Sequence, residues 1–120
     1  MSPERLVVHK FGGTSLADAA RFRAVADIVL ARPEPRRAVV VSAMAGVTDA
    51  LMRAVGLAGA RDPAYEREVA ALRERHHQTA AELLPPTAAD AARQAMEHEL
   101  ADAGDVLRAG WILRHSPRGA

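Results

Sequence analysis

The sequence contains no cysteine, which excludes a disulfide framework, a thiolate nucleophile and any cysteine-ligated metal site. It also contains no apolar run near the roughly 20 residues that a membrane-spanning helix needs. Its first residues, Met1 to Arg5, lead into a short apolar stretch and lack the pattern of a signal peptide. We therefore expect a soluble, cytoplasmic protein that does not bind a membrane.

The sequence also lacks an excess of positive or negative residues. The chain carries 16 Lys and Arg residues against 15 Asp and Glu residues, so its formal net charge is +1. This balance argues against a nucleic-acid-binding protein and against a disordered polyelectrolyte. With 49% hydrophobic residues in 120 positions, the chain is predicted to be one small globular domain or part of one. Lysine is nearly absent too, since Lys10 is the only lysine in the sequence.

A short strand followed by a helix is predicted at the start of the chain. Residues 6–9 form an apolar run that stops shortly before a pair of glycines, as in a buried strand that leads into a turn. Ser15 and Asp18 have the spacing of a capping box, and apolar residues recur at helical spacing after them. We therefore expect Ser15 to cap a helix over about residues 16–31.

A second strand is predicted at residues 38–41, after two prolines that end the helix. It is apolar without alternation and rich in valine, which is typical of a strand buried on both faces of a parallel sheet. Strand, helix and strand form a βαβ unit, and ligands bind at the carboxyl ends of the strands in such units. The βαβ core is expected over about residues 5–60, including a further helix that ends near Gly59.

The rest of the chain predicts a helical hairpin over about residues 62–114. Asp62 followed by Pro63 is expected to cap the first helix of the hairpin, and Thr87 is expected to cap the second. A pair of prolines separates these helices. The tail, residues 116–120, is predicted to be loosely packed.

The stretch Lys10–Ser15 has the composition of a phosphate-binding turn. Its two glycines let the backbone approach an anion, and amides at the start of the next helix point at it with the positive end of the helix dipole. Lys10 adds a full charge, and the hydroxyls of Thr14 and Ser15 can donate hydrogen bonds. The stretch is not a Walker sequence, because the lysine precedes the glycines. An ordinary turn with a solvated lysine is the alternative interpretation.

A second turn, residues 42–49, again places small and hydroxyl-bearing residues between a strand and a helix. Taken alone, its Thr48 is most simply interpreted as a helix cap. The two turns follow neighbouring strands, however. We therefore expect them to share one crevice, in which a phosphate donor and its acceptor could meet.

These turns resemble the motifs of a known family. Residues 8–19, VHKFGGTSLADA, resemble the sequence that opens aspartokinases, and residues 39–51, VVVSAMAGVTDAL, resemble their second motif at the expected separation. The sequence of these motifs is most similar to aspartokinases fused to homoserine dehydrogenase, and the resemblance is specific over about residues 6–55. It implies an α/β protein with the amino-acid kinase fold, a three-layer αβα sandwich. The chain would hold the amino-terminal portion of that fold together with a helical hairpin.

The resemblance also implies an activity and residues that perform it. Aspartokinases use ATP with Mg²⁺ to phosphorylate the side-chain carboxylate of L-aspartate, the first step of lysine, threonine and methionine biosynthesis. Lys10 would be catalytic, because it would neutralise charge on the transferring phosphoryl group. No general base is needed, since a carboxylate is already ionised at neutral pH. By resemblance, the ATP contacts would be Lys10, Phe11, Gly12, Gly13, Thr14 and Ser15, and the aspartate contacts would be Ser42 and Thr48, with no protein ligand to a metal among them.

The resemblance also implies that more sequence is needed for activity. Family members continue with a Gly-Glu segment, with adenine and magnesium contacts and with a regulatory domain, none of which is found in these 120 residues. We therefore expect a fragment that is inactive alone and belongs to a homo-oligomeric enzyme. Two alternatives stay open: a non-catalytic relative that acts as a binding or dimerisation module, and a kinase for glutamate or a nucleotide. The second motif, with its Thr48, argues against the last of these.

Three histidines in the predicted hairpin are the other group of potential metal ligands. His76 and His77 are adjacent, and His98 is expected on the facing helix. The sequence has no HExxH motif and no cysteine, so surface or interface histidines are expected there, without a metal. The sole tryptophan, Trp111, is expected to pack near the end of the hairpin.

Overall fold

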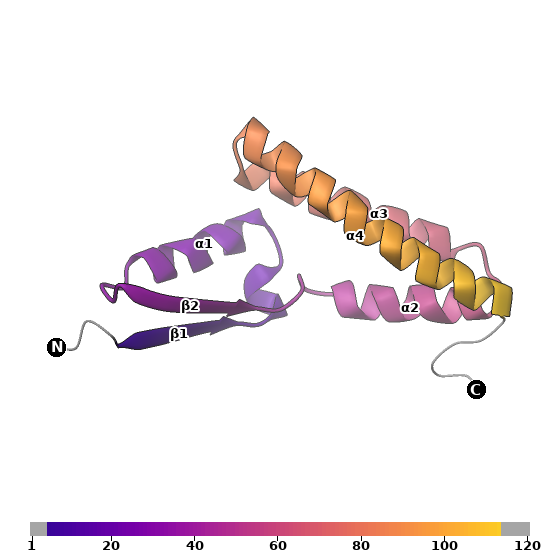
Figure 1. The fold of residues 1–120 in the computed structure, drawn as a ribbon, viewed down its shortest axis with the longest axis horizontal. Helices are drawn as coiled ribbons and strands as arrows, with labels where there is room; N and C mark the ends of the chain where they lie inside the picture. The colour runs from indigo at the N-terminus through magenta and orange to yellow at the C-terminus, as the bar shows by residue number, and fades with distance from the viewer. Residues whose placement is uncertain (1–4, 114–120) are drawn as a thin grey trace. The chain divides into compact units, whose positions relative to one another are not determined.

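The computed structural model describes residues 5–113, which form two compact units. One unit extends to Gly46 and the other begins at Val47 (Figure 1). The predicted loose tail, residues 116–120, lies outside the described residues. No helix within residues 5–113 is long and apolar enough to cross a membrane.

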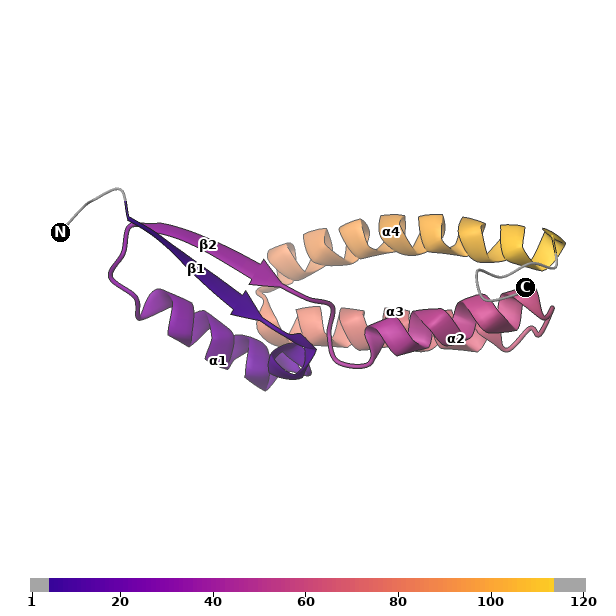
Figure 2. The same cartoon turned by 90° about the horizontal axis from the view of Figure 1, so that it is seen from below.

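Two parallel strands, β1 (Leu6–Phe11) and β2 (Arg36–Val41), form the sheet of the first unit. Their register pairs the first residues of the strands with each other and the last residues with each other, so both strands end at the same level. Helix α1 (Ala19–Leu30) lies in the connection between them. Figure 2 shows α1 running beside the strand pair. The predicted βαβ arrangement is therefore confirmed.

Helix α1 begins later than predicted and has a different cap. A short 3₁₀ turn, η1 (Gly13–Leu16), precedes it. Asp18 then adopts an extended backbone, and its Oδ1 accepts a hydrogen bond from the backbone N–H of Arg21 at 2.9 Å. Asp18 is therefore the N-cap. The prediction that Ser15 caps this helix is wrong, because the chain first makes the tighter η1 turn and starts α1 only after it.

The predicted burial of the second strand on both faces is not found in this unit. Three consecutive valines of β2, residues 39–41, expose between 47% and 54% of their surface. Leu6 and Val8 of β1 are exposed by 49% and 59%. A parallel strand is buried where other elements cover both faces of its sheet. Within residues 5–46, α1 and η1 are the only other elements available to cover these strands.

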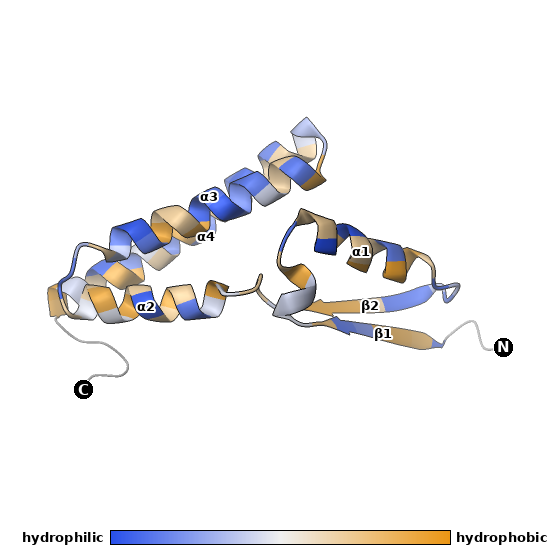
Figure 3. Ribbon diagram, turned by 180° about the vertical axis from the view of Figure 1, so that it is seen from behind, coloured by the Kyte–Doolittle hydropathy of each residue, from blue (hydrophilic) through white to orange (hydrophobic). Residues whose placement is uncertain are grey.

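The second unit contains three helices, α2 (Val47–Gly59), α3 (Tyr65–Leu83) and α4 (Pro86–Leu113). The last two form the predicted hairpin, and α2 packs against both of them. The contacts thus group α2 with the hairpin, whereas the sequence analysis placed it in the βαβ core. Figure 3 shows the apolar and polar bands that alternate along these helices.

Small side chains form the core of the second unit. Ala54 and Ala58 on α2 expose 0% and 1% of their surface, and Leu107 on α4 exposes 5%. Helix axes can approach closely where the contacting side chains are small. Tyr65 and Val69 of α3 pack against this cluster, so all three helices contribute to one core.

The starts of α3 and α4 follow the predicted caps only in part. Asp62 Oδ1 accepts a hydrogen bond from the backbone N–H of Ala64 at 2.9 Å, so Asp62 orders the turn before α3, which itself begins at Tyr65. Helix α4 begins at Pro86, which places Thr87 inside its first turn. The prediction that Thr87 is the cap is therefore wrong. Proline suits the first helical position, because its fixed φ matches the helix and its missing N–H is not needed there.

Arg61, in the link between α2 and α3, ties this link to the end of α4. Its φ is 56°, the only positive φ of a non-glycine residue in the described part of the chain. Its guanidinium donates hydrogen bonds to the carbonyl oxygens of Trp111 at 2.8 Å and Ile112 at 3.1 Å. Carbonyl groups in the last turn of a helix lack partners within the helix, and Arg61 supplies donors to two of them.

Candidate functional site

The two predicted turns lie side by side at the carboxyl ends of β1 and β2. The backbone N–H of Ser42 donates to the carbonyl oxygen of Phe11 at 3.2 Å, which extends the strand pairing to the start of the turns. A Cβ atom at Gly13 would lie 3.3 Å from the carbonyl oxygen of Ala43 and 3.5 Å from the Cα of Ala45. The missing side chain of Gly13 therefore permits a close approach between the turns.

Lys10 is an exposed cation one residue before the end of β1, opposite Val40 in the strand register. Within residues 5–113 it forms no ion pair or hydrogen bond through its side chain. Successive strand residues point to opposite faces, so Lys10 lies on the other face from His9 and Phe11. The rings of those two residues stack with their centroids 6.3 Å apart. The ammonium of Lys10 is thus available to an anion, whereas the carbonyl oxygen of Phe11 already accepts a hydrogen bond from Ser42.

The glycine turn leaves an open surface at Gly12. Its φ of −84° and ψ of 177° suit any residue, and no atom lies within 4 Å of the place where a Cβ would be. The amide of Ser15 donates to the carbonyl oxygen of Gly12 at 3.1 Å, so this amide is used inside the turn. Thr14 is exposed, and its hydroxyl has no hydrogen-bond partner in the part of the chain that the structure describes.

The second turn begins with an internally bonded hydroxyl. Ser42 Oγ donates to the carbonyl oxygen of Ala43 at 2.8 Å, and Met44, next in the turn, is 7% exposed and anchors it. Gly46 has a φ of 82°, a conformation that favours glycine. Thr48 is exposed within the first turn of α2, in the second unit, because α2 already begins at Val47. Its interpretation as a cap in front of the helix is therefore wrong.

One residue near the glycine turn was missed by the sequence analysis. Nη1 of Arg21 donates to the carbonyl oxygen of Thr14 at 3.1 Å. This contact joins α1 to η1 across the residues that separate them. Thr14 and Arg21 are seven residues apart but lie in two separate helical segments. Helical periodicity does not continue across the break between them, so no periodic signal in the sequence points to this contact.

His76 has a contact within its own helix, and His77 lies next to a residue of the facing helix. Nδ1 of His76 lies 2.7 Å from the carbonyl oxygen of Leu72 in the same helix. Nε2 of His77 lies 3.0 Å from Oε1 of Glu97 without the geometry of a hydrogen bond. No group of three or more His, Cys, Asp or Glu side chains within residues 5–113 is arranged to hold a metal ion.

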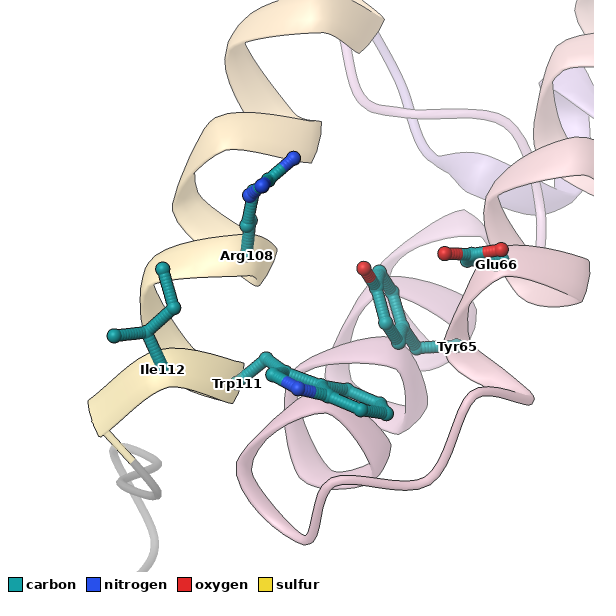
Figure 4. A pocket seen from close by; sticks show the side chains of 5 residues that line it. All are labelled: Tyr65, Glu66, Arg108, Trp111 and Ile112. Atoms are coloured by element: carbon teal, nitrogen blue, oxygen red, sulfur yellow. The ribbon is translucent and has the colours of Figure 1, made fainter.

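A shallow hollow of about 350 Å³ lies in the second unit, near the end of α4 (Figure 4). The rings of Tyr65 and Trp111 meet there with centroids 5.7 Å apart and planes inclined by 52°, so Trp111 packs as predicted. Ile112 points away from this ring pair in Figure 4. None of the predicted ATP or aspartate contacts is among the residues that line it, which are Tyr65, Glu66, Arg108, Trp111 and Ile112.

Comparisons with known proteins identify the family of the chain. Residues 5–109 match the Amino acid kinase family. The chloroplastic bifunctional aspartokinase/homoserine dehydrogenase of Daucus carota is 39% identical over 111 residues, which cover 91% of this chain and 12% of the carrot protein. Chloroplastic aspartokinase 1 of Arabidopsis thaliana is 38% identical over 79 residues, which cover 63% of this chain and 14% of that protein.

A solved structure shows the same fold. The crystal structure of E. coli aspartokinase III in complex with lysine and aspartate, in its T-state, superposes with a TM-score of 0.73 at 33% sequence identity. The match covers 88% of this chain and 22% of the E. coli chain, so the present chain corresponds to a fraction of its relatives' length. The predicted α/β class, the amino-acid kinase fold and the resemblance to aspartokinases are confirmed. The chain belongs to the amino acid kinase family.

Proposed function

We propose that this chain supplies the nucleotide-binding and aspartate-binding turns of an aspartate kinase. The enzyme would transfer the γ-phosphoryl group of ATP to the side-chain carboxylate of L-aspartate. The observation that carries the proposal is the approach of Gly13 to Ala43, which sets the turn after Lys10 beside the turn that begins at Ser42. The similarity to aspartokinases of plants and of E. coli supports the choice of aspartate as acceptor.

Lys10 has the central electrostatic role in this proposal. Charge spreads over the phosphoryl oxygens in the transition state of phosphoryl transfer, and a fixed cation stabilises it. The ammonium of Lys10 is exposed and has no counter-ion within residues 5–113, so no existing ion pair has to break first. Lysine acts on phosphate as a compact point charge, which distinguishes it from the planar guanidinium of arginine.

The other turn residues would position the two substrates. The open backbone at Gly12 and Gly13 admits the phosphates, with hydroxyl donors from Thr14 and Ser15. Ser42 Oγ donates to the carbonyl oxygen of Ala43, so its lone pairs are free to accept from the ammonium group of aspartate. Thr48 would contribute a second hydroxyl toward aspartate, and Phe11 would contribute its backbone toward ATP.

The chemistry requires no base from this chain, because the acceptor carboxylate is ionised at neutral pH. Mg²⁺ enters the proposal with ATP, since Mg²⁺ in such enzymes is held largely by phosphate oxygens and water with one or two carboxylates. The chain's own contribution is to place charge and hydrogen-bond donors around the phosphates.

The setting of the enzyme is part of the proposal. L-aspartate and ATP would be the substrates, within the biosynthesis of lysine, threonine and methionine. A homo-oligomeric complete enzyme and a cytoplasmic location are proposed with them. The relatives from Daucus carota and Arabidopsis thaliana are chloroplastic by name.

A hybrid enzyme tests this function. Residues 5–113 would replace the matching stretch of E. coli aspartokinase III, and folding would be checked by circular dichroism and gel filtration. We expect the hybrid to release ADP from ATP only when aspartate is present. A folded hybrid that binds ATP but gives no aspartate-dependent ADP would contradict the proposal.

Single substitutions in the hybrid test the proposed roles. Lys10→Ala should lower kcat by about 100-fold, the usual effect of losing one transition-state donor. Ser42→Ala should mainly raise the KM for aspartate. As a matched control, Arg32→Ala removes an exposed cation that pairs with Glu34 at 3.0 Å beyond the far end of α1, and it should change neither constant.

A further inference from the structure

Arg21 makes two hydrogen bonds that connect the first turn of α1 with the residues before it. Its guanidinium Nη1 donates to the carbonyl oxygen of Thr14 at 3.1 Å. Its backbone N–H donates to Oδ1 of Asp18 at 2.9 Å, which caps the helix. The side-chain bond spans the two residues between η1 and α1, so the helix holds the turn through this guanidinium.

The glycine turn has little rigidity of its own. It consists of four residues in a 3₁₀ conformation, and hydrogen-bond geometry in such segments is poorer than in an α-helix. Gly12, just before this segment, and Gly13, its first residue, add conformational freedom to the backbone. A bond from a rigid helix to the middle of this segment restricts the orientations that its peptide groups can adopt. Peptide groups that are held in the bound orientation lower the entropy cost of binding a ligand.

We propose that Arg21 is a positioning residue for phosphate binding. By holding the carbonyl group of Thr14, it fixes the peptide group between Thr14 and Ser15, whose N–H closes the turn onto Gly12, and so keeps the turn in the conformation that receives the phosphates of the nucleotide. Arg21 acts through the backbone, and it stands outside both sequence motifs, residues 8–19 and 39–51. The inference rests on the proposed function of the same turn and adds a residue that determines how well the turn binds.

The properties of arginine suit this role. The guanidinium is always charged and carries five N–H donors in a planar group, so one of them can serve the carbonyl while the positive charge stays beside the turn. Lysine at this position would keep the charge and could donate one bond with different geometry. Alanine would remove both. The link between α1 and η1 should therefore be strongest with arginine, weaker with lysine and absent with alanine.

Titration of the 120-residue chain with Mg²⁺-ATP, followed by NMR, tests the inference. Arg21→Ala should weaken Mg²⁺-ATP binding about fivefold to tenfold, as the loss of one exposed hydrogen bond implies. Arg21→Lys should recover most of the affinity. Arg32→Ala, which removes an exposed arginine paired with Glu34 after the end of α1, should bind like the unaltered chain.

Hydrogen exchange measured without ATP provides a second test, because the loss of charge alone should not change the exchange rate of an amide in the turn. The amide of Ser15 donates to the carbonyl oxygen of Gly12, so its exchange rate reports the order of the turn. It should rise in Arg21→Ala while the amides of β1 and β2 keep their rates. If affinity and Ser15 exchange in Arg21→Ala both equal those of the unaltered chain, the inference is overturned. If Lys10→Ala loses binding and Arg21→Ala keeps it, the inference fails alone; if the unaltered chain binds no ATP, the proposed phosphate-binding role of the turn fails with it.

Discussion

Gly13 and Ala43 approach each other so closely that a Cβ on Gly13 would lie 3.3 Å from the carbonyl oxygen of Ala43. Gly12, its neighbour, has no atom within 4 Å of the corresponding position. The adjacent glycines therefore have different roles. Gly13 allows the two turns to meet, and Gly12 leaves the surface open to a ligand.

This difference predicts opposite outcomes for two alanine substitutions. Gly13→Ala should destabilise the first unit by about 1 kcal/mol, because the new methyl group meets backbone atoms that have to move. Gly12→Ala should change stability by less than about 0.5 kcal/mol, since its φ is allowed and the space is empty. Native-state hydrogen exchange of the β1 and β2 amides measures both values. Equal stability of the two variants would show that the turns are not in contact.

The cap of α1 can be tested by another pair of variants. Asp18→Ala should destabilise the first unit by about 1 kcal/mol, because the N–H of Arg21 loses its acceptor. Ser15→Ala should have a much smaller effect, since the Ser15 hydroxyl has no hydrogen bond within residues 5–113. Hydrogen exchange of the α1 amides distinguishes them. A larger loss for Ser15→Ala would restore the capping box expected from the sequence.

Arg61 combines a left-handed backbone with two hydrogen bonds to the end of α4, and substitutions separate these features. Arg61→Ala loses the bonds and keeps the unfavourable φ, whereas Arg61→Gly loses the bonds but suits that φ. The alanine variant should therefore be less stable than the glycine variant by about 1 kcal/mol. Denaturation followed by the fluorescence of Trp111, the sole tryptophan, reports the second unit. A glycine variant that is the less stable of the two would contradict this account.

The chain by itself should not turn over aspartate. It spans 22% of the E. coli aspartokinase III chain that it resembles, so most of that relative has no counterpart in these residues. A coupled assay of ADP release with and without aspartate measures this directly. Aspartate-dependent ADP release by the purified 120-residue chain would show that these residues contain a complete active site.

The order of strands and helices could be predicted because its signals are local. The valine-rich run of β2 and the prolines around residue 85 mark an element and a break within a few residues. The cap of α1 was mispredicted because Ser15 and Asp18 are both good caps three residues apart. The choice between them depends on the 3₁₀ turn, Gly13–Leu16, that precedes the helix.

Contacts between elements were harder to predict. Valine at residues 39–41 shows that β2 is suited to burial, but composition does not say which elements cover it, and these residues are about half exposed. The hydrogen bond from Arg21 to Thr14 crosses a break between two helical segments, so no periodic pattern in the sequence indicates it. The proximity of the two turns could be predicted, because parallel strands in register bring their carboxyl ends together.

The central claim is that Lys10 and the glycine turn bind the phosphates of ATP beside the turn of Ser42. An NMR titration of the 120-residue chain with Mg²⁺-ATP, repeated with Lys10→Ala, tests it most directly. We predict that the amide signals of residues 12–15 and of Ser42 shift together, and that Lys10→Ala weakens binding by tenfold or more, about 1.4 kcal/mol. Shifts of the same size in Lys10→Ala, or shifts confined to the helices after Val47, would contradict the account.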